Sequence, residues 1–276
     1  MVVMQRNIHR LSSTDEDLAP PRRSGHGRTG MALPPDGSYA QLGLDPEQQR
    51  ALADRDPRLE LFRVAVEAQA QFALTKPEEL SARVRSARWG ELSGRLREAQ
   101  GADPLARPAV GDFVLARAEG EAAWRIEAVL PRRSRFVRST ARRRLEPQVI
   151  AANVDWVGVV TSPNEDFSVR RLERYLATIH ASGARPAVIV NKRDLVADVE
   201  PWLAEARAAA HDVPVLATSA LHEPPQQALA PLLGPGRTLA LVGSSGVGKS
   251  SLTNALLGEA RQRVAEIRAG DDKGRH

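Results

Sequence analysis

The chain has 276 residues, of which 42% are hydrophobic and none is cysteine, and its formal net charge at pH 7 is +5. This length suits about two domains with a sizeable core, and the lack of cysteine excludes disulfides and cysteine-ligated zinc in this chain. No apolar run approaches the ~20 residues of a transmembrane helix, and the N-terminus lacks the apolar stretch of a signal peptide, so we expect a cytoplasmic protein without membrane association. The positive net charge favours an anionic partner.

The first part of the chain, residues 1–40, holds charged, serine-rich and Gly/Pro stretches without a sustained period, such as Pro34-Pro35-Asp36-Gly37. We expect a disordered N-terminal arm here, and Met31 is a second candidate for the start of the protein. A short helix is predicted over residues 45–55, because Asp45-Pro46 is typical of a helix start.

The next part, up to about residue 130, is a series of short apolar segments separated by turn signals. Strands at this spacing indicate a small β-barrel, although the first segment could equally be an amphipathic helix. The segments are Leu61–Leu74, Leu80–Trp89, Gly111–Arg117 and Trp124–Leu130.

Residues 131–144 form a basic connector. One interpretation is a solvated linker, and the other is a contact with the phosphate backbone of RNA beside the barrel. Its arginines are Arg132, Arg133, Arg135, Arg138, Arg142, Arg143 and Arg144.

After the connector, apolar strands alternate with helices. This pattern predicts an α/β fold in which a parallel sheet is covered by helices on both faces. The expected strands are Val154–Thr161, Pro186–Val190, Val213–Ala217 and Thr238–Val242, and the expected helices are Val169–Ser182, Glu200–Ala210 and Lys249–Leu257.

A complete phosphate-loop motif, G-x-x-x-x-G-K-[ST], joins the last of these strands to the last helix. Glycines let backbone N–H groups converge on phosphate oxygens, and the helix N-terminus adds partial positive charge. We expect Lys249 to stabilise the β- and γ-phosphates and Ser250 to bind Mg²⁺ that accompanies the nucleotide. The loop residues are Gly243, Ser244, Ser245, Gly246, Val247, Gly248, Lys249, Ser250 and Ser251.

A base-reading motif, N-K-x-D, follows the strand that ends at Val190, at the sheet edge where ligands bind. The Asp194 carboxylate could accept hydrogen bonds from guanine N1–H and its 2-amino group, which adenine lacks, and a buried carboxylate would discriminate strongly. We expect Lys192 to lie along the base, and a backbone amide of Thr218-Ser219-Ala220 to meet guanine O6. The expected base-site residues are Asn191, Lys192, Arg193, Asp194, Ser219 and Ala220.

The order of the two motifs is reversed relative to ordinary GTPases, so the domain looks circularly permuted. Together with several strings, this order resembles the ribosome-assembly GTPase family RsgA, also called YjeQ. The strings are Ser93-Gly94-Arg95-Leu96, Pro108-Ala109-Val110-Gly111-Asp112, Ala151-Ala152-Asn153-Val154-Asp155 and Arg170-Arg171-Leu172-Glu173-Arg174-Tyr175-Leu176.

The resemblance implies an OB-fold β-barrel domain with a short leading helix over residues 41–140, followed by a circularly permuted P-loop GTPase domain over 141–276. It implies a GTP hydrolase that uses GTP with Mg²⁺, binds the small ribosomal subunit and its rRNA, and acts late in maturation of that subunit. We further expect a monomer.

The sequence also departs from the family. Beyond Gly274-Arg275-His276 the family continues with the switch threonines, a D-x-P-G loop and a zinc domain with Cys and His ligands, none of which this chain supplies. We therefore expect an incomplete chain with negligible hydrolysis, and an exposed apolar edge beside the phosphate-loop strand.

Two other functions are compatible with the residues alone. One is a guanine-nucleotide and RNA-binding fragment that does not hydrolyse GTP. The other is an ATP-using P-loop kinase in which N-K-x-D occurs by chance. The tryptophans Trp89, Trp124, Trp156 and Trp202 favour core packing over base stacking, and no histidine spacing indicates a metal site.

Overall fold

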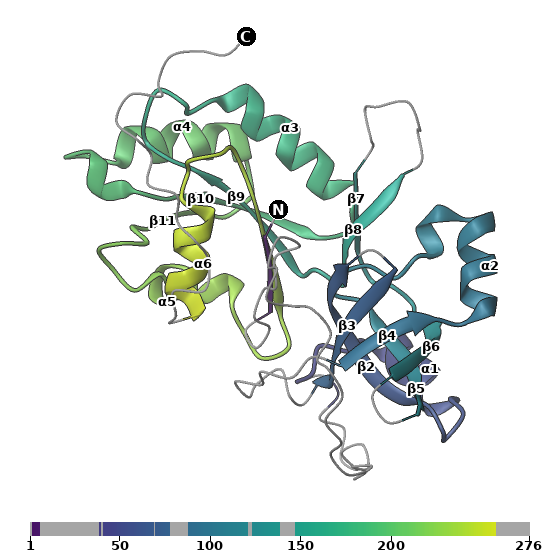
Figure 1. The fold of residues 1–276 in the computed structure, drawn as a ribbon. Coiled ribbons are helices and arrows are strands. Elements are labelled where there is room, and N and C mark those ends of the chain that lie inside the picture. The colour runs from purple at the N-terminus through teal and green to yellow at the C-terminus, as the bar shows by residue number, and fades with distance from the viewer. Residues whose placement is uncertain are drawn as a thin grey trace.

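The computed structural model describes residues 2–5, 39, 41–68, 70–77, 88–120, 123–138 and 147–257. Most of the N-terminal arm, the triplet Arg142–Arg144 and everything after Leu257 lie outside these residues. The described part consists of a β-barrel and an α/β sheet packed beside it (Figure 1). No helix in the described ranges is long and apolar enough to cross a membrane.

The barrel is closed by five strands in the order β2-β3-β4-β6-β5, an OB-like arrangement. Neighbours pair antiparallel except for β4 and β6, which run parallel. Aromatic and branched side chains fill its interior, among them Phe62, Phe72 and Ile126. The strands are β2 (Glu60–Ala68), β3 (Gln71–Thr75), β4 (Arg88–Leu92), β5 (Phe113–Glu119) and β6 (Ala123–Val129).

The helical alternative for Leu61–Leu74 is wrong, because this segment forms β2 and β3. Its apolar residues pack on both sides of the barrel wall. Phe62 and Val64 point into the barrel, whereas Leu61 packs outside it against Leu52 of α1 (Pro46–Ala53). A strand that lies between two layers is apolar on both sides. Its sequence therefore lacks the alternation of apolar and polar residues that distinguishes a half-buried strand from a helix.

Two elements flank the barrel and were not predicted from the sequence. Helix α2 (Gly94–Ala102) begins at Ser93, whose hydroxyl accepts a hydrogen bond from the Leu96 N–H at 3.4 Å. The short 3₁₀ helix η4 (Pro104–Ala106) follows it. Helix α2 buries no residue, so the apolar periodicity that reveals most helices is missing.

The basic connector is not simply a solvated linker. Part of it forms β7 (Arg135–Arg138), which pairs antiparallel with β8 (Gln148–Ala152). Figure 1 shows this hairpin between the barrel and the sheet. Backbone groups in this part of the connector are thus paired within a hairpin.

The α/β sheet has the order β1-β12-β9-β10-β11, and β9 to β12 pair in parallel. Helices α3 and α4 cover one face, and α5, the 3₁₀ helix η6 and α6 cover the other. The strands are β9 (Trp156–Thr161), β10 (Arg185–Val190), β11 (Val215–Ala217) and β12 (Thr238–Val242), and the helical elements are α3 (Val169–His180), α4 (Glu200–Ala210), α5 (Pro225–Ala228), η6 (Ala230–Leu232) and α6 (Lys249–Leu257).

The expected exposed edge beside β12 is wrong for the described residues. Strand β1 (Val2–Gln5) pairs antiparallel with β12, with Val2 opposite Leu241 and Gln5 opposite Thr238. Four residues of the arm that we expected to be disordered are therefore a strand. Their pairing satisfies backbone groups that an unpaired edge would leave open.

Candidate functional site

The phosphate loop follows β12 and leads into α6. Its glycines adopt backbone angles that other residues avoid, with φ of +141° at Gly243, +81° at Gly246 and +89° at Gly248. A Cβ at Gly243 would lie 2.2 Å from the Val160 carbonyl oxygen of β9. The loop can take this path only because these positions lack side chains, and such a path leaves backbone N–H groups free to face an anion.

The Lys249 ammonium folds back over the loop. It donates hydrogen bonds to the carbonyl oxygens of Gly243, at 3.0 Å, and Ser244. Ser250 follows in the first turn of α6. This geometry suits the expected roles, since a flexible amine resting on loop carbonyls can exchange them for phosphate oxygens, and a serine at this place can offer its hydroxyl to Mg²⁺.

The base loop begins where β10 ends. Asn191 is buried, with an exposed fraction of 1%, and its N–H donates to the Thr161 carbonyl of β9 at 2.9 Å. Lys192 adopts a left-handed conformation with φ of +63°, which turns the chain into the 3₁₀ helix η5 (Arg193–Leu195). The local geometry brings Asp194 back toward the end of β11.

The structure brings the two distant loops together. Asn191 Nδ2 donates to the Val247 carbonyl at 2.9 Å, and Gly248 lies so close that an added Cβ would be 2.4 Å from Asn191 Nδ2 and 3.7 Å from Lys192 Cε. Lys192 thus lies against the phosphate loop. One contiguous surface therefore carries both sequence motifs, although 56 residues separate Asn191 from Val247.

The segment after β11 completes this surface in an unexpected way. The Ala220 N–H donates to Asn191 Oδ1 at 3.1 Å, and the Ser219 N–H donates to Glu223 Oε1 at 2.7 Å. Both amides are thus engaged within the protein, whereas we expected an amide of this segment to face guanine O6. Glu223 has no place in the sequence motifs, and only the fold reveals it.

Asp194 is held by hydrogen bonding and is not buried. Its carboxylate accepts a hydrogen bond from the Ser219 hydroxyl, and its side chain is 29% exposed. The Ser219 hydroxyl is the main reason that the pKa of Asp194 lies below its usual value, with His222, 3.5 Å away, contributing further. Asp194 is therefore ionised at neutral pH and available as an acceptor.

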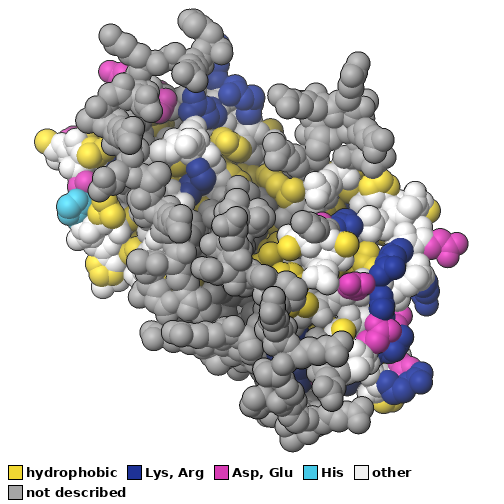
Figure 2. All heavy atoms as spheres, viewed as in Figure 1, with side chains coloured by type: hydrophobic (Ala, Val, Ile, Leu, Met, Phe, Trp, Pro, Cys, Tyr) yellow, Lys and Arg dark blue, Asp and Glu magenta, His cyan; other side chains and the backbone are white. Residues whose placement is uncertain are grey.

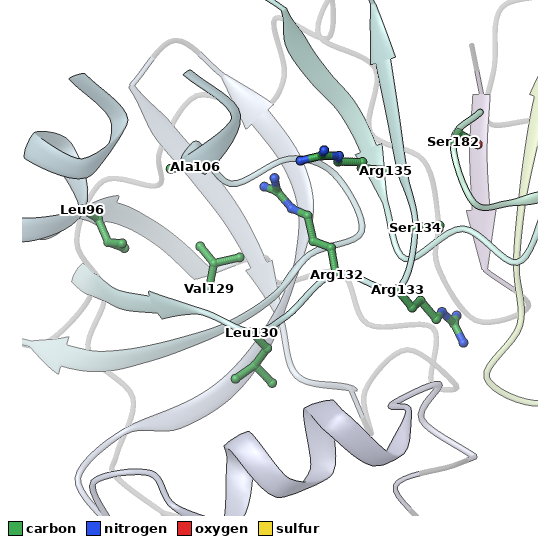
Figure 3. A pocket seen from close by; sticks show the side chains of 9 residues that line it. All are labelled: Leu96, Ala106, Val129, Leu130, Arg132, Arg133, Ser134, Arg135 and Ser182. Carbon is green, nitrogen blue, oxygen red and sulfur yellow. The ribbon is translucent and has the colours of Figure 1, made fainter. Parts of the chain in front are cut away.

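A second basic feature lies between the barrel and the sheet. A cavity of about 570 Å³ is lined by α2, β6 and the start of the connector, including Arg132, Arg133 and Arg135 (Figure 3). Arg132 pairs with the buried Asp112 at 2.6 Å, and Arg133 pairs with Asp155 at 2.7 Å. Burial raises the pKa of Asp112, and the hydrogen bonds from Arg132 counter only part of that rise.

Arg135 differs from its neighbours in the cavity. It is exposed, and its guanidinium forms no hydrogen bond or ion pair within the part of the chain that the structure describes. On the barrel, by contrast, basic and acidic side chains are interspersed (Figure 2), as in the pairs Arg97–Glu91 and Arg117–Glu127. Among the arginines that line the cavity, Arg135 is thus the one whose guanidinium has no acidic partner among the described residues.

Comparison with known proteins connects this site to a family. A family model described as RsgA GTPase matches residues 129–276, more than half of the chain. The protein "Small ribosomal subunit biogenesis GTPase RsgA" of Methanosarcina acetivorans is 48% identical over 171 residues, which are 62% of this chain and 46% of that relative. The protein of the same description from Opitutus terrae is 45% identical over 180 residues, with 62% and 49% covered. The chain spans about half the length of the curated relatives that it matches.

Solved structures share the fold. The crystal structure of YjeQ from Thermotoga maritima superposes with a TM-score of 0.56 at 22% identity, covering 72% of this chain and 65% of that chain. The structure of YloQ, described as a circularly permuted GTPase, gives a TM-score of 0.53 at 22% identity, covering 73% and 65%. The described barrel and parallel sheet share the fold of these structures.

Proposed function

This chain belongs to the RsgA GTPase family, and we propose on that basis that it binds GTP at the joined phosphate and base loops and acts in late maturation of the small ribosomal subunit. Residues 41–140 would form the barrel unit and residues 141–276 the GTPase unit. The boundary falls in the connection between β7 and β8. We also propose that the protein is cytoplasmic and monomeric.

The observation that carries the nucleotide proposal is the contact between the two loops. The Asn191 side chain donates to Val247 and accepts from Ala220, so one buried amide spans the phosphate loop and the segment after β11. A nucleotide needs its base and its phosphates recognised at a fixed separation, and shared side chains fix that separation. The residues that would contact it are Asn191, Lys192, Arg193, Asp194, Ser219, Ala220 and Gly243 to Ser251.

Magnesium fits the phosphate loop. The positive-φ glycines leave the loop backbone open, and Ser250 stands at the start of α6. Ser250 would hold the ion, which when bound neutralises phosphate charge. Lys249 would hold the β- and γ-phosphates, while Asp194 would orient the guanine.

The substitution Asp194→Asn tests base recognition. The amide can no longer accept from both guanine N–H groups, so GTP affinity should fall at least ~10-fold while xanthosine triphosphate gains affinity. Titration calorimetry with GTP, XTP and ATP measures this shift. Asp212→Asn is the matched control, because Asp212 is exposed just after α4. Equal affinity of the unaltered protein for ATP and GTP would contradict the proposal.

We propose that rRNA contacts the connector. Arg135 supports this, because its guanidinium has no partner among the residues that the structure describes and can pair with phosphate. Binding of an rRNA fragment should weaken as salt rises, and Arg135→Ala should reduce the slope of log affinity against log salt by about one. Changing Arg142–Arg144 to alanine should weaken binding further. A slope unchanged in all these variants would contradict the proposal.

A second candidate is a guanine-nucleotide and RNA-binding protein without turnover. The chain's coverage of about half of its relatives makes hydrolysis a separate question from binding. Release of phosphate from GTP in the presence of small ribosomal subunits distinguishes the two. Membership of a GTPase family argues against the ATP-using kinase.

A further inference from the structure

Arg171 reaches the phosphate loop from a neighbouring helix. It is the third residue of α3, and its NH1 group donates to the Ser244 hydroxyl at 2.5 Å and to the Asp166 carbonyl at 3.3 Å. Neither phosphate-loop nor base-loop motifs include this arginine. The connection after β9 brings it to a loop that lies 73 residues further along the chain.

Two cations meet at one residue of the loop. Arg171 contacts the Ser244 hydroxyl, while the Lys249 ammonium contacts the Ser244 carbonyl oxygen. Arg171 pairs with no carboxylate among the described residues, and its Nε and NH2 groups have no hydrogen-bond partner there. Like charges this close repel each other, and an anion placed between them relieves the repulsion.

The position of Arg171 indicates which part of a nucleotide it would face. The base loop contacts the end of the phosphate loop at Val247 and Gly248, whereas Arg171 contacts its beginning at Ser244. The base side and the Arg171 side are therefore opposite ends of the loop. A nucleotide whose base lies at Asp194 would extend its terminal phosphate toward Arg171.

We infer that Arg171 is an additional nucleotide-binding residue that contacts the γ-phosphate and makes the site prefer GTP over GDP. This inference rests on the proposed guanine-nucleotide function. It assigns to α3 a phosphate contact that complements Lys249. A planar guanidinium with unused donors suits a phosphate group with three terminal oxygens.

The test compares GTP and GDP affinity in matched variants, measured by titration calorimetry with Mg²⁺. Arg171→Ala should weaken GTP at least ~10-fold and GDP less than ~2-fold, since only GTP carries the contacted group; tenfold corresponds to about 1.4 kcal/mol. Arg170→Ala is the control, because Arg170 is an exposed arginine in the same first helical turn. It should leave both affinities unchanged.

Two further variants distinguish a contact between Arg171 and the nucleotide from a purely structural hydrogen bond between Arg171 and Ser244. Arg171→Gln keeps an N–H donor for Ser244 but removes the charge, so it should lose GTP preference as Arg171→Ala does. Ser244→Ala removes the hydroxyl that Arg171 contacts but keeps the arginine. Because Ser244 itself belongs to the proposed site, both affinities can fall, but the ratio of GTP to GDP affinity should be retained. Equal losses for GTP and GDP in Arg171→Gln, or a lost preference in Ser244→Ala, would overturn the inference. Absence of binding of either nucleotide to the unaltered protein would instead refute the proposed function.

Discussion

Gly248 keeps the phosphate loop and the base loop in contact. Its φ of +89° lies in the left-handed region, and the Asn191 amide occupies the space where a side chain would begin. Glycine is required here for two separate reasons, backbone conformation and close approach. The motif predicts the glycine for its effect on phosphate, whereas the structure adds its contact with Asn191.

Gly248→Ala should disrupt both properties. Alanine at positive φ costs about 1 kcal/mol, and the Cβ would push Asn191 away from Val247, so GTP affinity should fall at least ~10-fold. Gly120→Ala provides the control, because Gly120 has φ of +74° but nothing within 4 Å of an added Cβ. Calorimetric titration with GTP should find only the first variant impaired, and equal affinities in the two variants would contradict this explanation.

At the residue scale, the sequence predicted the two loops that the structure brings together, but not the contacts between them. The motifs predict that Asn191, Asp194 and Lys249 belong to the candidate site, because few other residue types suit the proposed roles at those spacings. They do not predict that Asp194 is exposed or that Ala220 donates to Asn191. Such contacts depend on side-chain rotamers and on the approach of distant segments, and local sequence determines neither.

At the scale of elements, strand β12 is anchored at its first residue by the barrel. The Thr238 N–H donates to Asp155 Oδ2 at 2.7 Å, and its hydroxyl accepts from Arg63 NH2 of β2 at 2.9 Å. Arg63 is fully buried, and burial lowers its pKa to about 9, so it remains charged at neutral pH. The first residue of the strand that leads to the phosphate loop is thus hydrogen-bonded to a buried arginine of the barrel.

Thr238→Val should lower the stability of the protein, because it removes a hydrogen-bond acceptor from the buried Arg63 guanidinium. Valine matches threonine in shape but offers Arg63 no acceptor, and a buried charged donor that loses a partner should destabilise the protein by about 1–3 kcal/mol. Urea unfolding measures the change. Thr178→Val is the control, since the Thr178 hydroxyl donates to Arg174 on the exposed side of α3, and it should stay within ~0.5 kcal/mol. Similar losses in both variants would argue against a special role for Thr238.

Element boundaries were predictable where local signals agree. Helix α4 and strand β12 have the expected limits, because Glu200-Pro201 suits a helix start and a short apolar run stops at Gly243. The hairpin of β7 and β8 was missed, since its arginines resemble a solvated linker. Strand β1 was missed because four residues carry too little pattern to stand out from a polar arm.

For the whole molecule, one buried amide joins three parts of the fold. Asn153 has φ of +54°, and its Oδ1 accepts from Gln48 Nε2 of α1 at 2.9 Å, while its Nδ2 donates to the Gly111 carbonyl at 3.1 Å. The Arg133 N–H also donates to Asn153 Oδ1, at 3.2 Å. Buried polar groups with all their partners present hold their surroundings in one arrangement.

Asn153→Ala should loosen the barrel from the sheet. Buried partners lose their hydrogen bonds and alanine must adopt positive φ, so the stability should fall by about 2–4 kcal/mol. Hydrogen exchange in increasing urea should show the barrel and sheet strands opening together in the unaltered protein and separately in the variant. Asn164→Ala, at an exposed asparagine that accepts a hydrogen bond from Ser162, should keep the joint opening. Joint opening in Asn153→Ala as well would show that other contacts link the two units.

This junction could not be predicted from sequence, because its partners are far apart in the chain. Gln48 and Asn153 are 105 residues apart, and Arg63 and Thr238 are 175 apart. The string containing Asn153 and Asp155 was recognisable only as a family resemblance. Its physical role becomes visible once both units are in place.

Strand β1 also offers a spectroscopic opportunity. Val2 pairs with Leu241, two positions before Gly243, and the chain contains no native thiol. A dye coupled to a cysteine introduced at position 2 would therefore be a single label, on the strand that pairs with the segment leading into the phosphate loop. Its fluorescence would follow nucleotide arrival in real time without any label on the nucleotide.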